Sequence, residues 1–223
     1  MLLNVENLNK SFGSVIAAKK VNFSMKENEI IGVIGSNGAG KTTFCNMITG
    51  YTSSDAGRIL YKNKNITNKG VQFIKKIGIH RSFQVPQIFD NLSVMENVLV
   101  PYLVSEGKQN SFVENAFTES RREYVEIMLK KFHLDNYKNK KASQLPQGNR
   151  KILDIIIAII GKPSIILMDE PTSGVSTDEK NEIMSNVLRA ISNLNISILF
   201  IEHDMEIVEK FSKRIVAFDN GQI

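Results

Sequence analysis

The sequence has a single cysteine, Cys45, so no disulfide can form within the chain, and a reducing compartment is expected. It also lacks the run of about 18 apolar residues that a membrane-spanning helix needs. Its most apolar stretch, 152–160, is interrupted by Asp154. The N-terminal segment MLLNVENLNK has neither the basic lead nor the apolar region of a signal peptide. Any work at a membrane would therefore be done through a partner.

Lysine and arginine slightly outnumber aspartate and glutamate, which gives a net charge of +5 over 223 residues. No run of lysine and arginine is dense enough to indicate DNA binding. The excess is explained by a solvated surface, an anionic ligand or an anionic membrane face. The length suits one domain with a full core, built as a single body or as two lobes.

Residues 35–42, GSNGAGKT, fit the phosphate-binding P-loop pattern G-x-x-x-x-G-K-[ST]. A short apolar strand is expected before them at 29–33, and a helix after them that ends at Gly50. Glycines let backbone N–H groups surround phosphate oxygens, and the helix N-terminus adds favourable partial charge. Lys41 is expected to reach the β- and γ-phosphates, and the Thr42 hydroxyl to bind Mg²⁺.

Two further apolar strands end in residues that can act on a phosphate. The strand at 165–169 ends in Asp169, a candidate Mg²⁺ ligand, followed by Glu170, which could polarise an attacking water. His203 follows the strand at 198–202, and we expect it at the same sheet edge, contacting the γ-phosphate.

The remaining pattern predicts strand and helix in alternation, interrupted by a helical segment. Capping boxes are expected at Ser93 with Glu96 and at Ser176 with Glu179. Strands are predicted at 2–8, 15–25, 57–61, 77–84, 165–169, 196–201 and 215–218, with a turn at 10–13. Helices are predicted at 71–76, from 92 onward, and at 111–132, 148–160, 178–193 and 204–210. This order of elements predicts a parallel α/β core with a helical insertion at about 92–160.

Over essentially the whole chain, these motifs resemble the nucleotide-binding subunits of ABC transporters. Further matches are RSFQ, which ends at Gln84, LPQGN at 145–149 in the place of the signature LSGGQ, and SGVS at 173–176 in the place of the D-loop. The resemblance implies an α/β fold, with a P-loop NTPase (RecA-like) core, an antiparallel β subdomain and an inserted α-helical subdomain. It implies one ATP-binding domain over 1–223, with its core at about 1–91 and 161–223.

The resemblance also implies a role for each matching residue. Phe12 would stack on adenine, and Gln84 would meet Mg²⁺, the attacking water and the membrane partner. Glu170 and His203 would be catalytic together with Gln84, and Mg²⁺ would be held by Thr42, Gln84 and Asp169. The residues expected to bind ATP are Phe12, Gly35, Ser36, Asn37, Gly38, Ala39, Gly40, Lys41, Thr42, Thr43, Pro146, Gln147 and Gly148.

Within the family, RSFQVPQIFDNLSVMENV, DEPTSGV and IEHDM look most like the branched-chain amino-acid importers. This implies an ATPase at the cytoplasmic face of the cell membrane, attached through permease subunits and served indirectly by a solute-binding protein. A second ATP-binding subunit is expected, in a heterodimer or a homodimer, and no nucleic acid is expected. The chain departs from the family at Pro146, Gln147, Ile157 and Ser176, which bears on the signature rather than on nucleotide binding.

Three alternatives remain for the function. A soluble ABC-type ATPase acting on nucleic acid or ribosomes usually has two such domains or a coiled-coil insertion, and this chain shows neither. A P-loop kinase or GTPase would leave LPQGN and His203 unexplained. A non-catalytic binding module would not need Lys41, Asp169 and Glu170 together.

Overall fold

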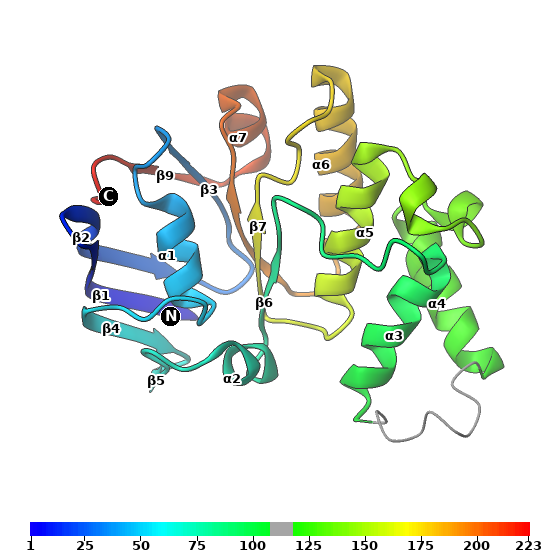
Figure 1. Cartoon of the computed structure of the whole chain (residues 1–223), viewed down its shortest axis with the longest axis horizontal. Helices are drawn as coiled ribbons and strands as arrows, with labels where there is room; N and C mark the ends of the chain where they lie inside the picture. Colours follow the sequence, from blue (N-terminus) through cyan, green and yellow to red (C-terminus); the bar gives the residue numbers. More distant parts are fainter. Residues whose placement is uncertain (108–117) are drawn as a thin grey trace. The chain divides into compact units, whose positions relative to one another are not determined.

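The computed structural model describes residues 1–107 and 118–223, which form two compact units (Figure 1). The first comprises residues 1–81, 163–170 and 195–223, and the second comprises residues 82–162 and 171–194. The single-domain organisation and its boundaries at about 92 and 160 stay predictions. Within the described ranges, no helix is long and apolar enough to cross a membrane.

The first unit contains a five-stranded sheet that carries the P-loop. Its order is β6 (Ile79–Ser82), β7 (Ile165–Asp169), β8 (Ser197–Ile201), β3 (Ile30–Gly35) and β9 (Arg214–Phe218). The pairs β7–β8, β8–β3 and β3–β9 are parallel. Every residue of β7 and β8 is buried, as expected of continuous apolar runs in a parallel sheet covered on both faces. The carboxyl ends of these strands therefore share one edge.

An antiparallel sheet of four strands completes the first unit. Its order is β2 (Val15–Met25), β1 (Leu3–Phe12), β4 (Ala56–Tyr61) and β5 (Lys64–Asn65). The Phe44 ring, on α1 (Lys41–Ile48), lies 5.3 Å from that of Phe23 in this sheet and 5.2 Å from that of Phe218 in the parallel sheet. One apolar core thus holds α1 and the loop before it against both sheets.

Two local predictions in the first unit were wrong. The expected turn at 10–13 is confined to Gly13 and Ser14, because the ladder between β1 and β2 continues to the pair Phe12–Val15. The strand expected at 77–84 is shorter in the structure, where only β6 is formed. Gly78 has φ +94°, which ends the turn after α2 (Val71–Lys76), and the backbone beyond Ser82 bonds to side chains instead of a strand.

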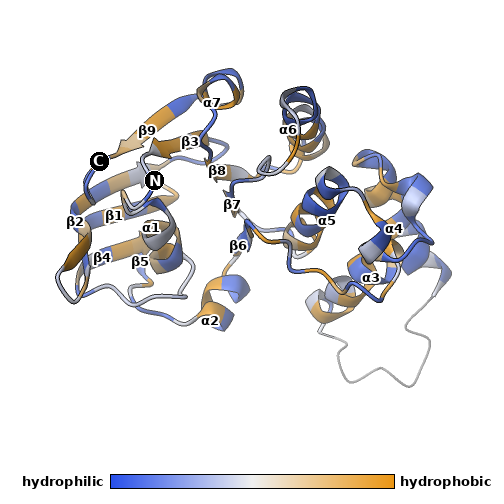
Figure 2. Cartoon of the chain, turned by 45° about the horizontal axis from the view of Figure 1, so that its top comes forward, coloured by the Kyte–Doolittle hydropathy of each residue, from blue (hydrophilic) through white to orange (hydrophobic). Residues whose placement is uncertain are grey.

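The second unit is helical. Its helices are α3 (Val94–Ser105), α4 (Glu119–Lys131), α5 (Gln147–Ile159) and α6 (Thr177–Ile191), with short 3-10 turns at Asp135–Tyr137 and Ala142–Gln144. Both predicted capping boxes are confirmed, at the starts of α3 and α6. The part of the predicted helix 111–132 before residue 118 lies outside the described residues. In Figure 2, α5 carries both hydrophobic and hydrophilic residues, and because residues 151–156 are all buried, the helix is covered on more than one face.

The remaining predictions agree with the structure apart from a few residues at their ends. Helix α1 ends at Ile48, and Gly50 follows with φ +79°, as predicted for its C′ position. Helix α7 (Met205–Phe211) lies against β3, where Gly32 leaves room for Val208. The short strand β5 was not predicted.

Candidate active site

The P-loop connects β3 to α1 through a glycine-dependent backbone. Gly40 has φ +104°, and a side chain there would also run into the carbonyl of Ala17. Gly38 has φ +81° and open space beside it. Side chains are thus excluded where the loop must be tight, and the backbone N–H groups stay accessible to an anion.

Lys41 begins α1, and its side chain folds back over the loop. Its ammonium donates to the carbonyl oxygens of Gly35 at 2.7 Å and Ser36 at 2.9 Å, and the residue is only 6% exposed. Burial lowers the pKa of Lys41, and the negative charges of Glu170 and Asp169 act in the opposite direction. The ammonium thus sits among neutral acceptors and carboxylates, where phosphate oxygens could replace the carbonyl groups.

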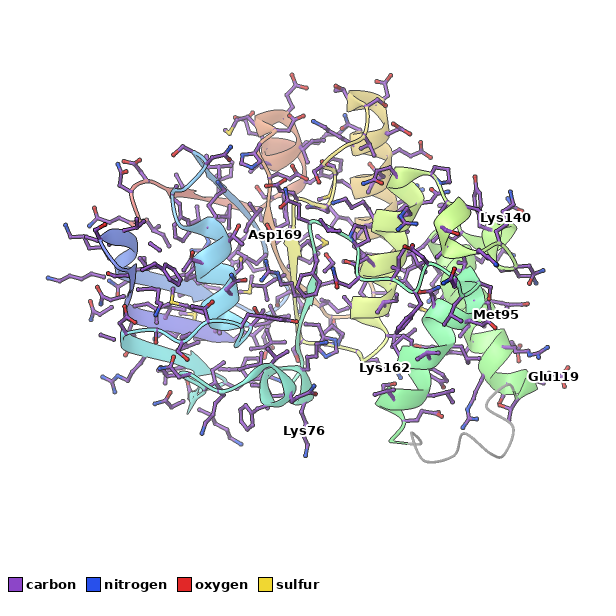
Figure 3. The ribbon with its side chains drawn as sticks, viewed as in Figure 1. Lys76, Met95, Glu119, Lys140, Lys162 and Asp169 are labelled. Carbon is purple, nitrogen blue, oxygen red and sulfur yellow. The ribbon has the colours of Figure 1, made fainter. Side chains whose placement is uncertain are left out.

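Asp169 ends β7 (Figure 3), and its carboxylate forms a buried ion pair. Its partner is Arg81 of β6, which also donates to the side chain of Asn46 on α1. Both side chains of the ion pair are 6% exposed. Neither Arg81 nor Asn46 was predicted from the sequence as a site residue. A signal was present, because an arginine inside a buried strand needs a carboxylate partner.

Glu170 and His203 lie together, as their positions after two adjacent parallel strands predict. Nε2 of His203 lies 2.8 Å from Oε1 of Glu170, and the carboxylate accepts this hydrogen bond. Glu170 has φ +49°, an uncommon backbone conformation for a residue with a side chain, and such conformations often occur at functional sites. The carboxylate therefore has an aromatic N–H donor beside it.

Phe12 presents an aromatic ring to solvent at the end of β1. The residue is 51% exposed, and the ammonium of Lys10 lies 5.1 Å from the ring centroid. Such a ring is available for stacking on a base. Its contact with adenine stays a prediction.

The signature residues surround the start of α5 in the second unit. Pro146 is the N-cap with φ −54°, and α5 starts at Gln147. Gly148 packs so closely that an added Cβ would lie 3.0 Å from Cδ1 of Ile183. A Cβ added at Gly174, in the SGVS segment, would lie 3.7 Å from Nε2 of Gln147. Gln84 is exposed, and its backbone is held by α5.

A glycine loop with a buried lysine, next to carboxylates at the ends of parallel strands, defines a P-loop nucleotide hydrolase. The family model for ABC transporters matches residues 18–173. The chain is 34% identical to the probable branched-chain amino acid transport ATP-binding protein LivG of Methanocaldococcus jannaschii, over 100% of this chain and 88% of the relative. It is 31% identical to the corresponding protein BraF of Pseudomonas aeruginosa, over 99% and 89%.

Solved structures agree. A nucleotide-free ATP-binding cassette from an ABC transporter superposes with a TM-score of 0.86, and an ADP-bound cassette with 0.87. Both are 32% identical, over 100% of this chain and 89% of theirs. The chain belongs to the ABC transporter family and is an ATPase with the P-loop fold that the sequence predicted.

Proposed function

We propose that this chain is the ATP-hydrolysing subunit of a membrane importer for branched-chain or related amino acids. The observation that carries the proposal is its similarity, over almost the full length of both chains, to transport proteins named for that cargo. The relatives reported above give no support to an ATPase acting on nucleic acid or ribosomes.

Nucleotide binding would use the first unit. Lys41 would exchange its bonds to Gly35 and Ser36 for β- and γ-phosphate oxygens, and Phe12 would stack on the adenine. No group of three or more histidine, cysteine or acidic side chains that could hold a metal occurs within residues 1–107 and 118–223. Mg²⁺ prefers oxygen ligands and often binds through one or two protein groups plus phosphates. Thr42 and Asp169, both in the first unit, fit that pattern, and a contribution from Gln84 stays a prediction.

Hydrolysis would depend on Glu170. Its carboxylate would accept a proton from the attacking water, which makes the water a better nucleophile. His203 would hold that carboxylate in place through the 2.8 Å contact and would turn to the γ-phosphate when ATP binds. Mg²⁺, when bound, would neutralise charge on the phosphates.

Transport requires partners that the chain itself does not supply. Cassettes of ABC transporters that are 25% and 26% identical to this chain form dimers, one of them bound to ADP and phosphate. We infer a dimer at the cytoplasmic face of the membrane, heterodimeric or homodimeric, attached to permease subunits. A solute-binding protein would deliver the cargo to those permeases.

ATPase assays and uptake measurements test these assignments. Lys41→Ala should abolish ATP binding, whereas Glu170→Gln should keep binding and slow turnover by about 10²-fold or more. Cells deprived of this chain should regain uptake of labelled leucine, isoleucine and valine with the wild type, and not with Glu170→Gln. Normal turnover by Glu170→Gln would refute the catalytic assignment. Unchanged uptake of all three amino acids without the chain would refute the cargo.

A further inference from the structure

The backbone around Gln84 is held by side chains rather than by a sheet or helix. Asp154 of α5 accepts from the N–H of Phe83 through Oδ2 and from that of Gln87 through Oδ1, both at 2.8 Å. The carbonyl of Gln84 accepts from the ammonium of Lys151, also on α5. One helix therefore holds three backbone groups: the N–H before Gln84, the carbonyl of Gln84 itself and the N–H of Gln87.

The two side chains that do this are buried. Lys151 is 2% exposed and Asp154 is 4% exposed. Lysine and aspartate are almost never so buried unless they are paired or hydrogen-bonded, because desolvating a charge is costly. They are three positions apart, so they lie on one face of α5. We call Lys151 and Asp154 the α5 clamp.

The α5 clamp also reaches a second predicted motif. The ammonium of Lys151 donates to Oγ of Ser173 at 2.9 Å, in the segment that resembles the D-loop. The helix itself starts at Gln147, within the segment that resembles the signature. A single buried lysine thus joins the signature helix to the backbone of Gln84 and to Ser173.

A purely structural role would explain why Lys151 and Asp154 are buried and hydrogen-bonded. It would not explain why their bonds go to the backbone on both sides of Gln84. Gln84 is exposed, so burial does not hold its side chain in one position. Its direction is set by the backbone at 83–87, and there Asp154 and Lys151 supply the bonds. Further along, Asn97 of α3 binds the N–H and the carbonyl of Phe89.

We propose that Lys151 and Asp154 are positioning residues for Gln84 in ATP hydrolysis. They hold residues 83–87 against α5, so that the Gln84 side chain starts from one fixed backbone position. Neither needs to touch ATP. The proposal rests on the proposed ATPase function and on the role of Gln84 within it. Reactions that depend on placement lose up to about 10²-fold when a reacting group is displaced by 1 Å.

The test compares Asp154→Asn and Lys151→Met with two exposed controls on α4, Glu123→Gln and Lys130→Met, which change the same charges. Asparagine can accept only one of the two N–H groups, and its amide nitrogen would face the other. We expect kcat to fall about 10- to 100-fold in both clamp variants, with ATP affinity within about twofold of the wild type. The controls should leave both quantities unchanged. Circular dichroism and thermal unfolding give the folded fraction, to which each kcat is normalised.

A double-mutant cycle separates positioning from general damage. If the α5 clamp acts through Gln84, adding Asp154→Asn to Gln84→Ala should lower kcat by less than about twofold further. Equal effects of Asp154→Asn in both backgrounds would overturn the proposal, and so would an unchanged kcat in either clamp variant.

Amide hydrogen exchange provides a readout that does not depend on turnover. In Asp154→Asn, the amides of Phe83 and Gln87 should exchange at least about tenfold faster, while those of the P-loop stay at the wild-type rate. Unchanged exchange at these two amides would overturn the proposal. If the wild type does not hydrolyse ATP, the proposed function fails, and the exchange result still decides whether the α5 clamp holds the segment.

Discussion

Replacing Arg81 by methionine should destabilise the protein far more than removing an exposed ion pair does. The guanidinium neutralises Asp169, and both side chains are 6% exposed. Methionine keeps much of the volume but leaves a buried carboxylate without its counter-charge. Breaking a buried pair in this way typically costs about 3–5 kcal/mol.

Arg58 provides the matched control. It pairs with Glu6 at 3.6 Å, and the side chains are 68% and 37% exposed. Pairs of this kind contribute about 0–1 kcal/mol, so Arg58→Met should have little effect. A double variant, Arg81→Met with Asp169→Leu, should recover most of the loss, because no unpaired charge remains buried.

Urea unfolding followed by circular dichroism measures these effects, since the chain has no tryptophan. With a slope of about 2 kcal/mol/M, Arg81→Met should lower the midpoint by about 1.5–2.5 M, and Arg58→Met by no more than about 0.5 M. Equal midpoints for the two single variants would refute the reasoning. So would a double variant that is no more stable than Arg81→Met.

Three other predictions follow from single residues. Phe12→Ala should weaken ATP and GTP binding by similar factors, because stacking contributes about 1–3 kcal/mol and tolerates different bases; unchanged affinity in a fluorescence titration would contradict it. Pro146 lacks the hydroxyl and N–H that could bind a phosphate, so Pro146→Ser in a Glu170→Gln background should strengthen the ATP-dependent dimer, each such bond contributing about 1.5–3 kcal/mol. A tight dimer before the change, with no gain after it in light scattering, would count against this. Burial raises the pKa of Cys45 to about 12, so iodoacetamide at pH 8 should label only the unfolded chain. The stability that follows from this raised pKa is complete below pH 9 and is lost as the pH rises towards 12. Rapid labelling of native Cys45 by iodoacetamide at pH 8 would refute its burial and its raised pKa.

Local signals in the sequence predicted most of the fold. The strands β7 and β8 are continuous apolar runs, and the capping boxes of α3 and α6 depend on residues three positions apart. The proximity of Glu170 and His203 could also be predicted, because both follow strands of one parallel sheet. These features depend on patterns within a few residues or on a general rule of sheet geometry.

The features that were missed depend on pairings between distant positions. Arg81 and Asp169 are 88 positions apart, and they meet because β6 and β7 are neighbours, an order that local patterns do not contain. The extent of β1 to Phe12 follows from its ladder with β2. Asp154 stood out only as an interruption of an apolar stretch, and Lys151 was not singled out, because their partners are backbone groups about 70 positions away.

The position of β3 in its sheet has a consequence for how the protein is made. Both neighbours of β3, which are β8 and β9, come from the last part of the sequence, and Asn28 bonds to Ser197 across 169 positions. A ribosome therefore finishes the P-loop strand long before it makes the strands that cover its edges. Until residue 201 has left the exit tunnel, β3 has two open edges, and one edge stays open until residue 218 has followed. Open edges invite pairing with other chains. We expect the nascent chain to need protection by a chaperone during this interval, and folding to be slow because its contacts are so distant.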